Sequence, residues 1–152
     1  MPRLSRYFLR ASLLYMLLGF TVGSLILMQK AIAFAPSLWA WLPVHVESVF
    51  IGWMTQFALG IAFWILPRLG PTRPRGNEIW SWGTFLLLNA GIWIGWIPVK
   101  GAAFLGRLME SMAILLFFLG NWPRLYPSPW ARNSPRNAKN TNASVHQDSS
   151  VN

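Results

Sequence analysis

Four long apolar runs, joined by short polar or turn-forming segments, make up most of this 152-residue chain. Each run reaches or approaches the ~20 residues that a helix needs to cross the hydrocarbon of a bilayer. Charged residues are only 11% of the chain, against about 25% in soluble domains. We therefore predict an all-α integral membrane protein, a four-helix bundle of antiparallel up-down topology embedded in the lipid bilayer. The four spans are Phe8–Gln29, Leu42–Leu66, Ile79–Val99 and Ala102–Gly120.

The positive charges alternate between the two sides of these spans. Only Lys30 and Lys100 fall in the second and fourth of the five flanking segments, whereas arginines crowd the other three. This distribution follows the positive-inside rule and predicts that both termini are cytoplasmic, in a multi-pass protein of the inner (cytoplasmic) membrane. It also argues against nucleic acid as the partner of the net +9 charge. The arginines on the predicted inner side are Arg3, Arg6, Arg10, Arg68, Arg73, Arg75, Arg124, Arg132 and Arg136.

Two segments differ from the spans in composition. Residues 123–152 are rich in Pro, Asn and Ser, and we expect a disordered cytoplasmic tail there, after a four-span transmembrane domain at residues 1–122. The basic start followed by AIAFA, residues 31–35, suggests a cleaved signal peptide as an alternative for the first span. Its apolar region is longer than the usual 7–15 residues, so we expect an uncleaved anchor.

Small residues recur at the spacing that lets helices approach closely. Gly19 and Gly23 in the first span, and Gly91 and Gly95 in the third, form small-xxx-small pairs. Helix packing alone explains them, and we assign them no chemical role.

Three charged residues fall at membrane depth near the predicted outer side. Arg107 and Glu110 are three residues apart and therefore share a helix face. Glu47 enters the membrane from the same side, so it is expected to meet Arg107 across the bundle. We predict a structural polar cluster of Glu47, Arg107 and Glu110.

His45 is the one histidine inside a span, and its face of the helix also carries Gly52, Gln56 and Gly60. Glu47, two residues on, is rotated by about 200° and points elsewhere. A histidine beside small residues could face a groove for a planar ligand, because a neutral imidazole is a good axial ligand of heme iron. The alternative is an interfacial histidine hydrogen-bonded to water.

The run from His45 through Gly52-Trp53, with Gln56, Gly60 and Leu66-Pro67-Arg68, resembles the second membrane helix of heme-copper oxidase and nitric oxide reductase subunit I. The resemblance covers about the first 70 residues. It implies that His45 ligates the iron of a heme b, with Gly52 and Gln56 beside the heme and Arg107 near a propionate. The family's later metal-binding histidines are absent, and Glu47 stands where short relatives often have a second histidine.

Two functions remain open. The first is a heme-binding membrane protein associated with respiratory electron transfer, without an oxygen- or NO-reducing centre of its own. The second is a non-catalytic accessory or assembly subunit with no cofactor, which docks on other membrane subunits or self-associates. The chain has no cysteine and no recognisable catalytic constellation, so we do not expect an enzyme.

Overall fold

A computed structural model of the chain describes residues 1–67 and 78–125. Every regular element in these residues is helical, as predicted. The first span is one long helix, α1 (Arg3–Ile32), and the last two spans are α4 (Glu78–Gly95) and α5 (Ala102–Asn121). Residues 68–77, and residues 126–152 of the predicted tail, lie outside the described residues.

The second predicted span is composite rather than one regular α-helix. It begins with a 3₁₀ segment, η1 (Pro36–Trp41), and continues as α2 (Leu42–Glu47), the π-helical η2 (Ser48–Thr55) and α3 (Gln56–Ile65). A π-helix is bonded from i to i+5 and is rare; where it occurs it often lies near functional sites. The Thr55 hydroxyl donates to the Phe50 carbonyl, five residues back, at 2.9 Å, which follows the π spacing.

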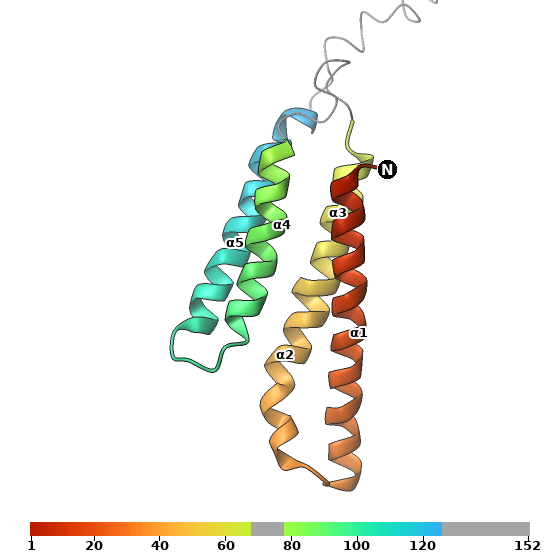
Figure 1. Ribbon diagram of the computed structural model, residues 1–152, viewed down its shortest axis with the longest axis vertical. Helices are drawn as coiled ribbons and strands as arrows, with labels where there is room; N and C mark the ends of the chain where they lie inside the picture. The colour runs from red at the N-terminus through yellow and green to blue at the C-terminus, as the bar shows by residue number, and fades with distance from the viewer. Residues whose placement is uncertain (68–77, 126–152) are drawn as a thin grey trace, which may run out of the picture.

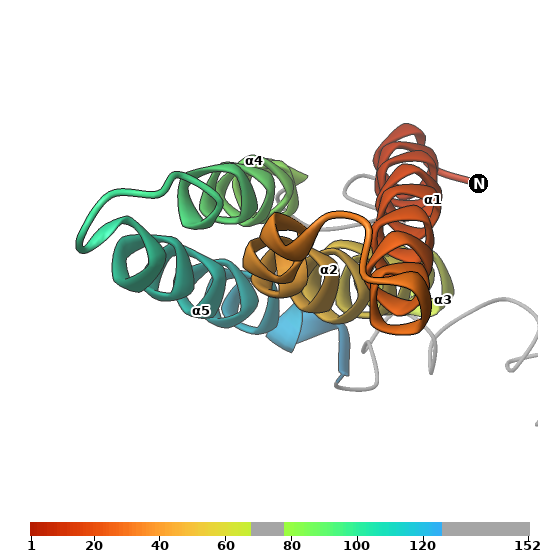
Figure 2. The same ribbon diagram turned by 90° about the horizontal axis from the view of Figure 1, so that it is seen from below.

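The helices form two antiparallel hairpins (Figures 1 and 2). In the first hairpin, α1 packs along α2, η2 and α3; in the second, α4 packs along α5. The turn between α4 and α5 stops short of the connection between α1 and α2, so the far end of the first hairpin extends beyond the second (Figure 1). Gly101 begins α5 from a left-handed conformation, φ 90°, which favours glycine.

The surface differs from that of a soluble protein. Leucine, phenylalanine and tryptophan side chains cover the outside, whereas serine, glutamine, asparagine and glutamate side chains are buried between the helices beside an apolar core. Three helical stretches are long and apolar enough to cross a membrane, namely Arg3–Ile32, Pro36–Ile65 and Ala102–Leu125. The third predicted span, α4, is helical but is not among them: it has 18 residues and includes Glu78 and Asn89. These features indicate a lipid environment.

Aromatic contacts and one hydrogen bond join the two hairpins through α1 and α4. Phe8 meets Phe85 edge-on at 5.1 Å between ring centroids, and the Tyr15 hydroxyl donates to Asn89 Oδ1 at 3.0 Å. The buried core spans both hairpins and consists of Leu4, Phe8, Leu59, Phe63, Leu88, Ala113 and Phe117.

The 3₁₀ turn η3 (Trp122–Leu125) follows the end of α5, and its Arg124 is buried, with 1% of its surface exposed. The described helical structure thus includes residues 123–125, which we had assigned to the tail.

Candidate functional site

His45 is held against α1 by a hydrogen bond and by a glycine. Its Nδ1 lies 2.7 Å from the Gly19 carbonyl oxygen. Because a carbonyl can only accept, Nδ1 donates this hydrogen bond, and in the neutral imidazole Nε2 then carries the lone pair. Gly23 makes room for the ring, since a Cβ there would lie 2.5 Å from His45 Cε1. The orientation and tautomer of the imidazole are thus set by α1.

The His45 ring lines a hollow of about 240 Å³ at the end of the first hairpin where α1 connects to η1 and α2. Lys30, in the last turn of α1, and Trp39, in η1, line the same hollow. The Lys30 and His45 side chains therefore border one space. Among the described residues, Nε2 has no hydrogen-bond partner. We had not linked Lys30 to His45, because they lie on different helices, α1 and α2.

The groove expected beside Gly52 is filled by side chains of α1. A Cβ at Gly52 would lie 2.5 Å from Tyr15 Cγ, and one at Gly60 would lie 2.8 Å from Phe8 Cβ. Both glycines face α1, as their spacing predicted, but they serve helix packing in this structure. Gln56 lies between them in sequence, is fully buried, and its amide atoms have no hydrogen-bond partner in the described part of the chain.

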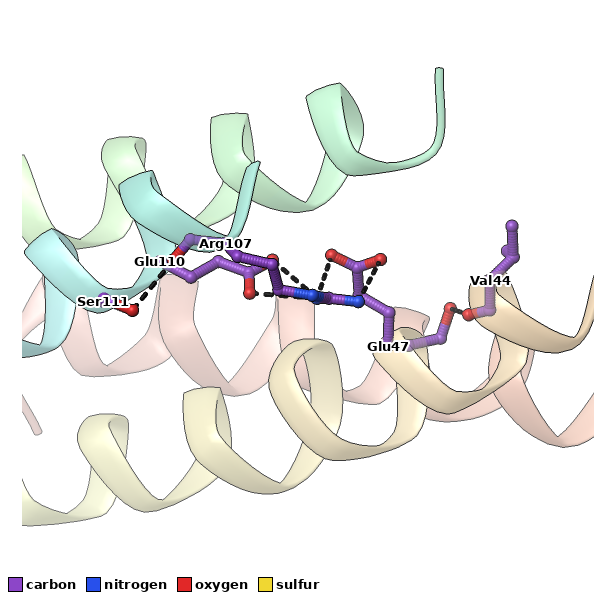
Figure 3. A network of polar contacts seen from close by, with 6 residues as sticks. Val44, Glu47, Arg107, Glu110 and Ser111 are labelled. Carbon is purple, nitrogen blue, oxygen red and sulfur yellow. Dashed lines mark hydrogen bonds and ion pairs between the residues drawn. The ribbon is translucent and has the colours of Figure 1, made fainter. Parts of the chain in front are cut away.

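Glu47, Arg107 and Glu110 form the predicted polar cluster. Arg107 Nη1 lies 2.7 Å from Glu47 Oε1 and 3.1 Å from Glu110 Oε2, so one guanidinium connects two carboxylates (Figure 3). Arg107 Nη2 also donates to Glu47 Oε2 at 3.3 Å. Both glutamates are 3% exposed, whereas half of the Arg107 side chain is exposed. The cluster joins α2 of the first hairpin to α5 of the second.

Glycines of α4 create the space that these carboxylates occupy. A Cβ at Gly95 would lie 2.9 Å from Glu47 Oε1, and one at Gly91 would lie 3.0 Å from Glu110 Cγ. Gly106 of α5 sits so close to α4 that a Cβ would lie 2.6 Å from the Gly91 carbonyl oxygen. The close approach predicted for Gly91 and Gly95 is confirmed, and it also lets Glu47 reach between α4 and α5.

The four residues expected around a heme do not meet at one site. His45 and Gly52 face α1, whereas Arg107 binds Glu47, whose side chain points away from His45 toward α5. Arg107 is engaged by two carboxylates and does not border the His45 hollow. Of that set, only His45 borders the hollow, and the cation that lines it with His45 is Lys30.

Arg124 forms a second junction between the hairpins, which the sequence analysis missed. Its guanidinium donates to the carbonyls of Phe63, Leu66 and Pro67 at 3.1, 2.7 and 3.1 Å, and it lies 5.0 Å from the Phe63 ring centroid. It also donates to Asn121 Oδ1 at 2.9 Å. A guanidinium at the carboxyl end of α3 satisfies carbonyls that have no helical partner. We had interpreted Arg124 only as a marker of the inner side.

No group of three or more His, Cys, Asp or Glu residues able to hold a metal ion occurs in residues 1–67 and 78–125. No family model, curated protein or solved structure matches the chain.

Proposed function

We propose that this protein is a small multi-pass protein of the inner membrane that binds heme b through His45 and associates with respiratory electron transfer. The observation that carries the proposal is the bond from His45 Nδ1 to the Gly19 carbonyl. In metal-ligating histidines, the N–H of the other ring nitrogen almost always donates a hydrogen bond to a carbonyl, a carboxylate or water. This bond orients the ring and raises the basicity of the ligating nitrogen. In the proposed topology four helices cross the membrane and both termini are cytoplasmic.

Two residues of the hollow would hold the heme. His45 Nε2 would bind the heme iron, and Lys30 would pair with a propionate. Bound heme would supply one-electron chemistry. Because the hollow is only about 240 Å³ and opens outward, most of the macrocycle would lie outside it, against lipid, another subunit or a second copy of the chain. The pairing with Lys30 replaces the one first expected with Arg107.

The test is a reduced-minus-oxidised visible spectrum of detergent-purified protein produced with ample heme. The wild type is expected to show b-type bands that His45→Ala abolishes and that Val46→Ala, a change at the exposed neighbouring residue, preserves. Bands of equal size in His45→Ala would place any heme elsewhere and overturn the proposal.

A second function is favoured by the half-exposed Arg107 beside two buried carboxylates. A charge at membrane depth usually faces a partner or a cavity. We propose, as the alternative, a non-catalytic accessory or assembly subunit without a cofactor. Absence of bands in the wild type, together with co-purifying membrane subunits that Arg107→Gln releases, would favour this function over heme binding.

A further inference from the structure

Three arginines share one face of α1 near its N-terminal end. Arg3, Arg6 and Arg10 lie within about 60° of one another around the helix axis. Together with Tyr7 they line a hollow of about 220 Å³, and all three are exposed. This arginine hollow lies at the end of the molecule where α1 and α4 begin (Figure 1). It does not include His45, so it is separate from the proposed heme ligand.

The described residues do not neutralise the charge of the arginine hollow. Within residues 1–67 and 78–125, no carboxylate forms an ion pair with Arg3, Arg6 or Arg10. The first turn of α1 also contains no acidic residue. Like charges spaced three or four residues apart on a helix repel one another and destabilise it. An anion bound among the three guanidinium groups would relieve this repulsion.

The donors that line the hollow suit a phosphate group. A guanidinium can donate two parallel hydrogen bonds to phosphate oxygens, and it stays charged at every physiological pH. Tyr7 adds a phenolic hydroxyl, which can also donate. The Tyr7 ring packs against Trp82 of α4, with 5.5 Å between the ring centroids. One wall of the hollow is therefore held in place by a contact between the two hairpins.

The same face of α1 becomes apolar directly beyond Arg10. Leu14 and Leu17 lie on this face, and they are 68% and 66% exposed. They belong to a helical stretch that is apolar enough to cross a membrane, so they meet hydrocarbon in a bilayer. A ligand that matches the whole face has an anionic group at one end and an apolar chain at the other. A free phosphate or a nucleic acid would match the arginines alone.

We propose that the arginine hollow binds the phosphate of one anionic phospholipid, whose acyl chain lies along Leu14 and Leu17. In the proposed topology the hollow is at the cytoplasmic leaflet, which carries anionic lipids. This inference goes beyond heme binding and does not depend on it.

The experiment titrates delipidated, detergent-purified protein with phosphatidylglycerol and, in parallel, with phosphatidylcholine, whose headgroup has no net charge. Native mass spectrometry counts the lipids bound per chain and gives a dissociation constant for each lipid. Arg10→Gln removes one guanidinium from the hollow. The matched control is Lys100→Gln, which removes one positive charge from an exposed residue that does not line the hollow. Circular dichroism and size exclusion show whether each variant folds.

The wild type is expected to bind one phosphatidylglycerol more tightly than phosphatidylcholine. Arg10→Gln should weaken this binding about fivefold, which is the effect of one arginine on an anionic headgroup, with an unchanged heme spectrum. Lys100→Gln should leave the affinity for phosphatidylglycerol unchanged. If Arg10→Gln does not fold, Arg3→Gln is expected to have the same effect.

Two results would overturn the proposal. Equal affinities of the folded arginine variant and Lys100→Gln would mean that phosphatidylglycerol does not bind in the arginine hollow. Displacement of the lipid by inorganic phosphate at an equal concentration would mean that the apolar chain contributes nothing and that the ligand is a free phosphate.

Discussion

Arg107 Nη1 and Glu47 Oε1 lie 2.7 Å apart, although sixty residues separate them in sequence. This ion pair connects the two hairpins, and Glu110 shares the same guanidinium. The two glutamates are buried, so they depend on Arg107 for compensation of their charge. Loss of Arg107 should therefore lower the free energy of unfolding by more than the loss of a surface ion pair would.

Arg107→Leu is expected to lower the free energy of unfolding by about 2–4 kcal/mol, since it leaves two carboxylates buried without a cation. The half exposure of Arg107 keeps the value below that of a fully buried pair. Thermal melting in detergent measures it. Adding Glu47→Gln and Glu110→Gln to Arg107→Leu should restore much of the loss, and a melting temperature unchanged in Arg107→Leu would contradict the role of the ion pair.

Gly106→Ala is expected to destabilise the second hairpin by about 1–3 kcal/mol, because the new Cβ would lie 2.6 Å from the Gly91 carbonyl oxygen of α4. The control is Gly83→Ala on α4. Its Cβ would meet only Leu116 Cδ2, the end of a flexible side chain, at 3.0 Å. Alanine there is expected to be neutral or stabilising by up to about 1 kcal/mol. Similar melting curves for the two variants would show that the α4–α5 approach is less tight than described.

Arg124→Ala is expected to lower the free energy of unfolding, measured by thermal melting in detergent, by at least about 2 kcal/mol. The reason is that the carbonyls at the end of α3 lose a charged donor. Arg124→Lys should recover only part of this, since an ammonium cannot reproduce the spread of the guanidinium donors. Arg6→Ala, at an exposed arginine of α1, is the control for loss of positive charge. Full recovery by lysine would mean that charge alone, and not donor geometry, matters at this site.

Gly23→Ala is expected to displace the His45 ring, since the added Cβ would lie 2.5 Å from Cε1 and 2.7 Å from Nδ1. The bond to Gly19 would be lost, and the b-type bands should weaken or shift. Ser24→Ala, at the exposed next position, should leave the spectrum intact.

Gly52→Ala tests the other expected heme contact. Because Tyr15 covers Gly52, the substitution should lower the melting temperature, and heme should be lost only to the extent that the fold is lost.

The topology is testable because the chain has no native cysteine. With a membrane-impermeant maleimide added to intact cells, Lys100→Cys is expected to react, whereas Asn152→Cys should react only after permeabilisation. Labelling of Asn152→Cys in intact cells would place the C-terminus outside and overturn the positive-inside assignment.

Some of the site follows from helical geometry and was predictable. The rotation between His45 and Glu47 predicted that they face different partners, and they do: α1 for His45 and α5 for Glu47. The contact of Glu47 with Arg107 followed from their similar depth. Gly52 shows the limit of the same reasoning, because a glycine face predicts only that something approaches closely. Here the approaching group is Tyr15, not a planar ligand.

The sequence by itself determined that the described chain is helical and suited to lipid, because long apolar runs permit few other structures. It also identified Gly91 and Gly95 as positions of close packing, but not Gly106, which packs against them. Only the tertiary structure decided how the two hairpins are offset, which leaves a cleft beside Trp96, and that Arg124 binds the end of α3. These outcomes depend on contacts between residues far apart in sequence and on the 3₁₀ and π segments. Neither the offset of two helices nor a local change of helix type is encoded in hydrophobic periodicity.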